Sequence, residues 1–436
     1  MKPNILLVNP AIYDFTAYDF WLKPYGLMRA AGRLRNIGRL TLYDALDRRH
    51  PAFDPHGRIG TDAWGRGSYP GRRIDKPACF KHIPRYYRRF GMDRTVFQRV
   101  LAEQGPFDAV LIQTVMTYWY PGVKEVIDDV RRYCPQATIV LGGFYAAACT
   151  EHARSLGTDL VIRGDDFEPL AQLLGCDLPD DALPAWELYP KLDTGVMTLT
   201  RGCPFRCSYC YVPRSGVGFS PRPLSQCLAE LRQLLSLGVH NIAFYDDALL
   251  YRPESILLPF LHAVIEQRHT VNFHTPNALH ARFMTADIAR LMVRAGFKTF
   301  YLGFESRSET FHEQTGSGKV VSDELATAVE NLLSAGVKRR NITAYEMLGH
   351  PKADIQQLEP SMRYANSLGI QIMLSDFSPI PGTPDGDLCG SIVDLSEPLN
   401  HNKTAFPIFY LGDKTVNDYK QLCKQLNRNI KNDPIF

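Results

Sequence analysis

Residues 195–384 repeat a short apolar strand followed by an amphipathic helix six times, and this repeat limits the folds open to the chain. The predicted strands are Val196–Thr200, Asn241–Asp246, Val271–Thr275, Lys298–Phe304, Asn341–Leu348 and Gln371–Phe377. Leucines at helical spacing follow the first strand, and Gly238 ends that helix. Right-handed β-α units of this kind form a partial, open barrel, whose site lies at the carboxyl ends of the strands.

A second strand–helix pattern occupies residues 1–174. Its predicted strands are Asn4–Asn9, Arg39–Leu46, Ala109–Thr114, Thr138–Leu141 and Asp159–Arg163, and its predicted helices include Tyr25–Ile37 and Val123–Tyr133. Such alternation predicts a doubly wound, Rossmann-like α/β domain with a mostly parallel sheet. The proline-containing residues 175–194 then predict a linker, and residues 385–436 predict a C-terminal cap or tail with a helix over Thr415–Leu426.

Three cysteines, Cys203, Cys207 and Cys210, lie on the loop after the first of the six strands. Thiolates spaced this closely commonly hold an iron–sulfur cluster. Three protein ligands on a four-iron cluster leave one iron open, and an open position is typical of catalytic metal sites. The alternatives are a zinc site or chance. Zinc would take a fourth ligand, for which Cys227 and His240 are the nearest downstream candidates.

The spacing Cys-x3-Cys-x2-Cys, with Tyr209 before the last cysteine, resembles the radical SAM superfamily. A Rossmann-like domain before a partial (β/α)6 barrel is similar, more narrowly, to the members with a cobalamin (B12)-binding domain. The resemblance covers residues 1–384. It implies a [4Fe-4S] cluster on the three cysteines and S-adenosyl-L-methionine (SAM) at the open iron, where one electron produces a 5′-deoxyadenosyl radical. It also implies a reductant such as flavodoxin or ferredoxin.

The resemblance extends to polar and glycine residues at the strand ends. The implied SAM-binding residues are Asp246, Asp247, Asn277, Arg282, Glu305, Ser306 and Gly349. A carboxylate after the second strand would accept a hydrogen bond from the methionine ammonium, although adjacent aspartates can equally cap the next helix. After the fifth strand the chain departs from the superfamily's Gly-Leu-Pro-Gly, because His350 and Lys352 replace the second and fourth residues.

The implied cobalamin-binding residues lie at strand ends of the N-terminal domain. They are Thr114, Thr117, Gly142, Gly143 and Gly164. Glycines there would let the backbone approach a flat macrocycle, but tight turns and packed side chains explain these positions equally well. Residues 54–60 miss the histidine motif Asp-x-His-x-x-Gly by one residue, and Leu46 stands where a histidine after the second strand would be needed. Many members lack this histidine, so both alternatives, with and without cobalamin, stay open.

Charge is uneven along the chain. Residues 1–100 contain 19 basic and 8 acidic residues, and aromatic residues are mixed with the basic ones between residues 58 and 99. Such a mixture is compatible with a nucleic acid or a phosphorylated ligand. Because no nucleic-acid module is recognised, a solvated insertion at about residues 50–100 is the preferred interpretation. Ten cysteines without a disulfide framework, and no apolar run of about 18 residues, predict a cytoplasmic chain without a membrane span.

The leading hypothesis is a radical SAM enzyme that acts on an unidentified small-molecule or peptide substrate. Cobalamin-dependent methyl transfer is one outcome; cobalamin-independent rearrangement, ring closure or transfer of another SAM fragment are others. The second hypothesis is RNA modification of the tRNA methylthiotransferase type, whose extra cluster would need Cys79, Cys134 and Cys149. The third is a non-catalytic protein that binds an iron–sulfur cluster or cobalamin.

Overall fold

The computed structural model describes residues 2–54, 59–316 and 322–431, and the chain divides into two compact units. The first unit comprises Met1–Gly195, Ala229–Val239 and Ser396–Asn402. The second comprises Val196–Leu228, His240–Leu395 and Lys403–Phe436. Neither unit is a single stretch of sequence, so the tail predicted as one cap at residues 385–436 is divided between them.

A five-stranded parallel sheet forms the centre of the first unit. Its spatial order is β10-β9-β8-β1-β4, with bounds β1 Asn4–Asn9, β4 Arg39–Asp44, β8 Ala109–Gln113, β9 Thr138–Gly142 and β10 Leu160–Val161. In chain order this is the 2-1-3-4-5 arrangement of doubly wound sheets, which confirms the predicted Rossmann-like domain. The topological switch point lies between β1 and β8, and ligands of such sheets bind at the carboxyl ends of those strands.

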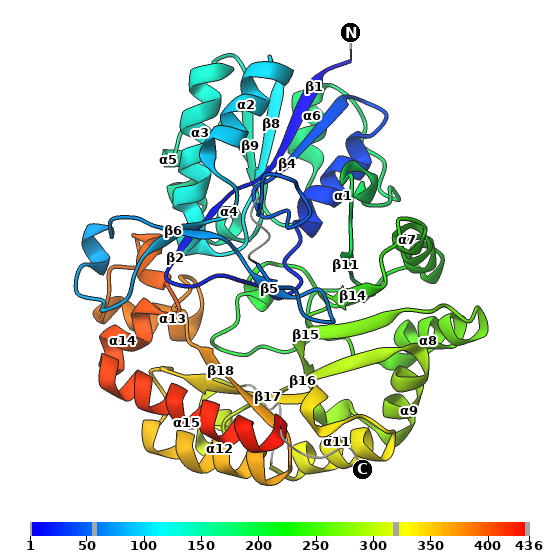
Figure 1. The fold of residues 1–436 in the computed structure, drawn as a ribbon, viewed down its shortest axis with the longest axis vertical. Coiled ribbons are helices and arrows are strands. Elements are labelled where there is room, and N and C mark those ends of the chain that lie inside the picture. Colours follow the sequence, from blue (N-terminus) through cyan, green and yellow to red (C-terminus); the bar gives the residue numbers. More distant parts are fainter. Residues whose placement is uncertain (1, 55–58, 317–321, 432–436) are drawn as a thin grey trace. The chain divides into compact units, whose positions relative to one another are not determined.

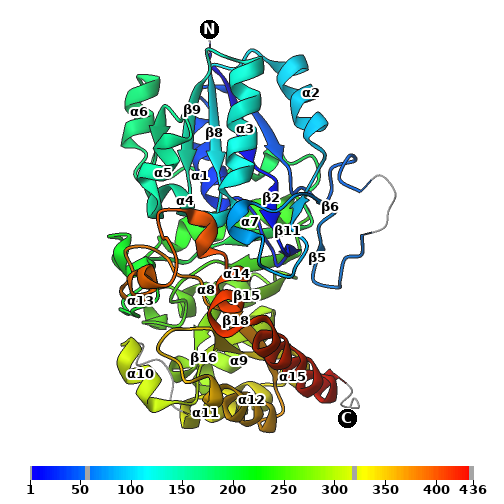
Figure 2. The ribbon, with the colours of Figure 1, turned by 90° about the vertical axis from the view of Figure 1, so that its left-hand side faces the viewer.

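Helices cover both faces of this sheet (Figures 1 and 2). One face carries α2 (Arg94–Gln104), α3 (Tyr120–Tyr133) and α5 (Thr150–Ser155), and the other carries α1 (Tyr25–Leu34) and α6 (Glu168–Leu174). The apolar run from Ile5 to Val8 is fully buried because β1 is covered from both sides. This double burial explains why the strand has no polar–apolar alternation in the sequence.

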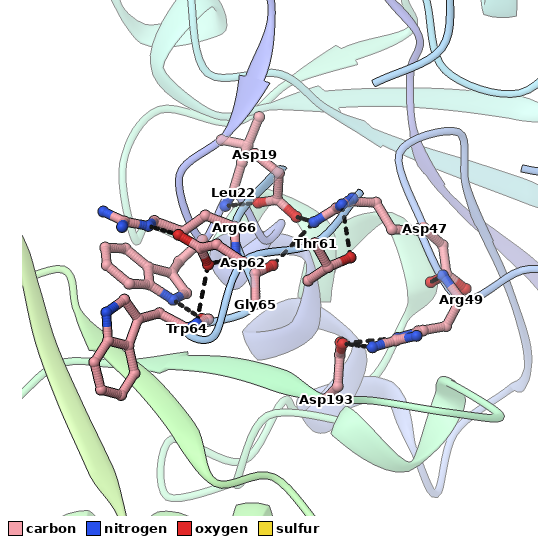
Figure 3. Close-up of polar contacts among 12 residues, drawn as sticks. Asp19, Leu22, Asp47, Arg49, Thr61, Asp62, Trp64, Gly65, Arg66 and Asp193 are labelled. Carbon is pink, nitrogen blue, oxygen red and sulfur yellow. Dashed lines mark hydrogen bonds and ion pairs between the residues drawn. The ribbon is translucent and has the colours of Figure 1, made fainter. Parts of the chain in front are cut away.

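The described part of the basic insertion is folded, and three of its arginines, together with Arg48 and Arg49 just before it, form ion pairs within the first unit. Short strands β5 (Gly67–Ser68), β6 (Gly71–Arg73) and β7 (Arg88–Phe90) pair with β2 (Ile12–Asp14), β3 (Tyr18–Asp19) and each other. The ion pairs are Arg48–Asp19, Arg49–Asp193 and Arg66–Asp62, the last two drawn with their neighbours in Figure 3, together with Arg89–Glu125 and Arg94–Asp129. Arg48 and Arg89 are buried in these pairs, so the insertion is more than the solvated segment that the sequence predicts.

The second unit contains the predicted barrel. Its six strands lie in the order β11-β14-β15-β16-β17-β18, with bounds β11 Thr194–Met197, β14 Asn241–Phe244, β15 Asn272–His280, β16 Phe297–Glu305, β17 Ile342–Leu348 and β18 Gln371–Asp376. The pairing is parallel from β14 to β18. The longer helices between and after the strands are α7 Leu224–Ser236, α8 Leu257–Glu266, α9 Ala286–Ala295, α11 Ser322–Ser334 and α12 Leu358–Ser367, with the shorter α10 at Glu309–Thr315. The first two residues of β11 and the part of α7 from Ala229 onward belong to the first unit.

All six barrel strands differ from their predicted bounds by at least one residue, and the first and third differ most. The first ends at Met197 rather than Thr200, because Thr200–Arg201 (β12) pairs antiparallel with Ser220–Pro221 (β13) and turns the chain away. The third runs on to His280 instead of ending at Thr275, with a shift in its register against β16 on the way. Both differences concern the carboxyl ends of strands, where loops form the site.

The end of the tail protects the edge of the barrel. Helix α15 (Asp413–Lys431) packs beside α12 and against the edge strand β18 (Figure 2). The Asn427 side chain exchanges two hydrogen bonds with the backbone of Ile372, at 2.7 and 2.8 Å, and Lys420 forms an ion pair with Asp376 at 2.6 Å. The tail thus satisfies an edge that would otherwise expose unpaired backbone groups. None of the helices described is both long and apolar enough to cross a membrane.

Candidate functional site

The three clustered cysteines line one cavity of the second unit. Cys203, Cys207 and Cys210 lie on the loop that follows β12, and the cavity that they line offers about 580 Å³ of atom-free space that is open to solvent. The wall opposite the loop is formed by residues at the ends of β14, β15 and β16. They are Asp247, Ala248, Tyr251, Ala278, Leu279, His280 and Gly303. The cavity therefore lies at the carboxyl ends of the barrel strands, where the sequence predicts the site.

The chemistry of this donor set fits a cluster better than a single ion. The cavity is lined by three thiols, those of Cys203, Cys207 and Cys210. A zinc site would bring its ligands to about 2.3 Å from one centre. In an iron–sulfur cluster each thiolate bonds a different iron, so three thiols around a shared cavity suit it without meeting at one point.

The cysteine loop is anchored by residues between the cysteines. The amide of Ser208 donates to the carbonyl oxygen of Thr315 at 2.9 Å, and the amide of Cys210 donates to that of Cys207 at 3.1 Å. The hydroxyl of Tyr209 donates to the carboxylate of Glu305. Burial, and then the Glu305 charge, raises the pKa of Tyr209 well above its usual range, so this phenol stays a hydrogen-bond donor. The aromatic residue of the motif thus joins the loop to the end of β16.

The two adjacent aspartates after β14 have different positions. Asp246 is almost fully buried, and its carboxylate accepts hydrogen bonds from the amides of Leu199 and Thr200 and from the Thr200 hydroxyl, at 2.6 to 3.1 Å. Burial raises the pKa of Asp246 to about 7, while these hydrogen bonds act in the opposite direction. Asp247 is exposed and lines the cysteine cavity. Asp246 therefore holds the start of the cysteine loop, and Asp247 is the aspartate that a ligand in the cavity can reach.

This division leads to a first prediction. Replacing Asp246 with alanine leaves two buried amides without their acceptor and should lower the free energy of unfolding by about 2 to 4 kcal/mol. Replacing the exposed Asp247 with alanine should change it by less than about 0.5 kcal/mol. Urea denaturation of both variants measures the difference. Equal losses would contradict the structural assignment of Asp246.

Asn277 and Arg282, which the sequence places after the third barrel strand, do not line the cavity. The Asn277 amide donates to the carbonyl oxygens of Tyr245 and Asp246, at 3.0 and 3.3 Å, and so joins the ends of two neighbouring strands. Arg282 forms an ion pair with Glu324 at 2.7 Å. His280, by contrast, lines the cavity and packs on Phe205 with ring centroids 4.7 Å apart.

Glu305, Ser306 and Gly349 line a second, smaller cavity of about 360 Å³ in the same unit. Glu305 has a φ of +70°, a left-handed conformation that is strained for a residue with a side chain. Gly349 has a φ of +86°, and a Cβ there would come within 2.8 Å of Pro407. Four of the seven predicted SAM residues thus line cavities, Asp247 in the first and Glu305, Ser306 and Gly349 in the second. Tyr209 connects the two cavities, because it lies on the cysteine loop and bonds Glu305.

The first unit has a cavity of about 260 Å³ at its switch point. Asn9 and Pro10 after β1 and Thr114 after β8 line it, together with Lys23 and Trp119. Thr117 does not: it is fully buried and its hydroxyl lies 3.0 Å from Nδ1 of His401. The cavity occupies the position where doubly wound sheets bind ligands.

The predicted glycines give this edge an open backbone. A Cβ on Gly164 would meet nothing within 4 Å, and one on Gly142 would meet no atom nearer than 4.0 Å. Gly143, with a φ of +93°, turns the chain tightly against Thr114. Gly142 and Gly164 therefore border open space, while the positive φ of Gly143 and of Gly164, which is +61°, gives each of these two a structural reason to be glycine. Part of the incomplete histidine motif, residues 55–58, lies outside the described residues.

The three cysteines needed for a methylthiotransferase-type second cluster do not come together. Cys134 follows the C-terminal end of α3, where its sulfur packs near Gly105. Cys149 follows β9 and α4 (Phe144–Ala148), next to Tyr145, and so lies at the opposite end of the strands from Cys134. The 14 residues of α3 span about 21 Å between these two ends. A shared cluster on Cys79, Cys134 and Cys149 is therefore incompatible with the fold.

Comparison with known proteins identifies the second unit. Residues 197–365 match the Radical SAM superfamily. An uncharacterised methyltransferase of Pyrococcus horikoshii is 23% identical over 235 residues, which cover 51% of this chain and 48% of that protein. A tRNA-2-methylthio-N(6)-dimethylallyladenosine synthase of Aquifex aeolicus is 26% identical over 232 residues, or 50% of this chain and 51% of that protein. The chain spans about half the length of the curated relatives it matches.

Solved structures with a similar fold cover nearly the whole chain. The radical SAM methyltransferase TsrM from Kitasatospora setae, solved with tryptophan and a SAM analogue, has a TM-score of 0.66 at 16% identity and covers 89% of this chain and 76% of its own. The cobalamin-dependent radical SAM enzyme OxsB has a TM-score of 0.58 at 13% identity, covering 100% and 62%. The predicted resemblance is confirmed: the chain contains a radical SAM domain at residues 197–365, within the fold of cobalamin-dependent radical SAM enzymes.

Proposed function

We propose that this chain is a radical SAM enzyme in which Cys203, Cys207 and Cys210 hold a [4Fe-4S] cluster. The observation that carries the proposal is the shared cavity, which the three thiols line at the carboxyl ends of the barrel strands. When bound, the cluster supplies one electron, which splits SAM into methionine and a 5′-deoxyadenosyl radical. An external reductant must deliver that electron.

Asp247 is the residue best placed to orient SAM in this cavity. Its exposed carboxylate lies on the wall facing the cysteine loop, and a carboxylate binds an ammonium group through charge-assisted hydrogen bonds. Such bonds contribute about 1.5 to 3 kcal/mol, so alanine at Asp247 should weaken SAM binding at least about tenfold. Titration of the reconstituted protein with SAM measures this. Unchanged affinity would remove Asp247 from the site.

Cobalamin is the second cofactor of the proposal. The switch-point cavity, the open glycine backbone and the hydroxyl of Thr114 support binding at the carboxyl edge of the first unit's sheet. When bound, cobalamin carries a methyl group, so the proposed reaction class is methyl transfer to an unidentified small-molecule or peptide substrate. TsrM and OxsB, which share the fold, have been solved with cobalamin.

Anaerobic incubation of the reconstituted protein with SAM and dithionite tests both parts. Mass spectrometry should detect 5′-deoxyadenosine, and gel filtration should leave about one cobalamin per chain, visible in its absorption spectrum. S-adenosylhomocysteine would indicate use of SAM as methyl donor. SAM cleavage without retained cobalamin would support the radical SAM assignment but reject cobalamin-dependent methyl transfer. An intact cluster that never cleaves SAM would reject the radical SAM assignment itself.

A further inference from the structure

A residue from beyond the last barrel strand holds the middle of the cysteine loop. Asp385 lies on α13 (Pro384–Leu388), and its side chain is fully buried. Its amide donates to the carbonyl oxygen of Ser208 at 3.2 Å, and the Ser208 hydroxyl donates to its carboxylate. Ser208 stands between Cys207 and Cys210. Asp385 therefore contacts the loop one residue from a proposed cluster ligand.

The same carboxylate also binds two side chains from the loop after β17, those of His350 and Lys352. Nε2 of His350 donates to Oδ2 at 3.0 Å, and Nζ of Lys352 lies 2.6 Å from Oδ1. The Lys352 amide donates to Nδ1 of His350, so the histidine proton is on Nε2, facing Asp385. Although burial opposes ionisation, the hydrogen bonds from His350, Lys352 and Ser208 lower the pKa of Asp385 to about 2. A buried, ionised carboxylate thus joins two loops of the site.

The turn that presents Asp385 leaves little freedom. The Thr383 hydroxyl caps α13 by accepting a hydrogen bond from the Gly386 amide at 3.0 Å, and Asp387 accepts one from Gly382 at 2.8 Å. A Cβ on Gly386 would come within 1.9 Å of the carbonyl oxygen of Ile380, so only glycine fits there. The backbone of this turn therefore fixes the position of Asp385 through contacts that do not involve the cysteine loop.

We propose that Asp385 is a positioning residue that fixes Ser208, and through it Cys207 and Cys210, against the loop after β17. The inference rests on the proposed function only where it concerns the cluster, because the contacts belong to the protein chain itself. Two consequences follow. Loss of the carboxylate should loosen the loop in the absence of a cluster, and loss of its negative charge should make a bound cluster easier to reduce, since nearby charge tunes such potentials.

The experiment compares Asp385→Asn with Asp387→Asn, a matched loss of charge at an exposed position on the same short helix. Asparagine keeps the shape but cannot form the ion pair with Lys352. In the apoprotein, hydrogen exchange at the amides of Ser208 and Cys210 should accelerate at least about tenfold for Asp385→Asn and stay unchanged for Asp387→Asn. In the reconstituted protein, the midpoint potential of the cluster should shift to more positive values only for Asp385→Asn.

Ser208→Ala keeps the test decisive if Asp385→Asn does not fold. It removes one hydroxyl from the network and leaves the His350 and Lys352 contacts in place, so exchange at Cys210 should rise in the same direction, by a smaller factor. The proposal would be overturned if a variant that folds, Asp385→Asn or Ser208→Ala, kept the hydrogen-exchange rates and the cluster midpoint potential of the wild type. A wild-type protein that binds no iron would reject the proposed function instead, and the exchange rates of the apoprotein would still decide the role of Asp385.

Discussion

Alanine at Cys203 is expected to abolish the cluster and, with it, all cleavage of SAM. Each thiolate would bond its own iron, so two remaining cysteines cannot hold a four-iron cluster at its normal occupancy. Reconstituted wild-type protein should contain about four irons per chain and the variant less than about one. Formation of 5′-deoxyadenosine should fall at least about 100-fold, which corresponds to about 2.7 kcal/mol or more in the reaction barrier.

Cys176→Ala is the matched control for this experiment. Cys176 is a partly exposed cysteine just after α6 in the first unit and lines none of the cavities described above. Its loss should leave both iron content and 5′-deoxyadenosine at wild-type values. If Cys203→Ala kept its iron and its product while Cys176→Ala lost them, the cluster would lie elsewhere.

The second large effect concerns a buried carboxyl group in the barrel wall. Glu346 of β17 is fully buried, and its Oε2 accepts a hydrogen bond from the Ser361 hydroxyl at 2.7 Å. Its Oε1 has no hydrogen-bond partner in the described part of the chain. Burial raises the pKa of Glu346 from 4.5 to about 8. Near neutral pH the folded protein therefore keeps this side chain protonated.

The sign of the pH dependence follows from that shift. Below pH 4.5 the group is protonated in both states and contributes no difference; between pH 4.5 and about 8 only the unfolded state ionises, so folding stability falls as pH rises. The total loss is at most about 5 kcal/mol. Glu346→Gln removes this term, so the variant should become progressively more stable than the wild type between pH 5 and 8.

Urea denaturation at several pH values measures the effect. The control is Glu359→Gln on α12, an exposed residue that pairs with Arg363 on the same helix. Its stability difference from the wild type should stay within about 0.5 kcal/mol at every pH, as for surface ion pairs in general. A flat curve for Glu346→Gln as well would show that Glu346 ionises normally in the folded protein.

Sequence periodicity predicted the strands of the two main sheets and their order along the chain, but not the short strands β2, β3 and β5 to β7 or helices such as α2 and α6. Asn4–Asn9 was predicted to the residue, because a buried parallel strand is a continuous apolar run between polar ends. The cysteine loop and Asp247, which line one cavity, could be proposed as site residues because their chemistry is local: the spacing of the residues and the end of a strand both appear in the sequence. The predictions that failed or stayed open concern groups whose partners are far along the chain.

Asp246 and Asp385 illustrate that limit. Nothing in the sequence distinguishes the roles of Asp246 and Asp247. Asp246 is a structural acceptor because the fold brings Thr200 next to it, whereas Asp247 lines the cavity. Asp385 lies in a turn after the last barrel strand, and its partner Ser208 is 177 residues away. Contacts of that range depend on the packing of the whole unit.

The seven residues Ser396–Asn402 complete the first unit, so its folding depends on a segment that is synthesised late. They belong to that unit, where the Asn402 amide donates to Asp14 at 2.9 Å and His401 reaches Thr117. A ribosome builds the chain from its N-terminus, and N-terminal units generally fold first. Here 401 residues must be synthesised before Asn402, whose side-chain amide binds the buried Asp14. The nascent first unit therefore waits, incomplete, until the whole radical SAM barrel has been translated.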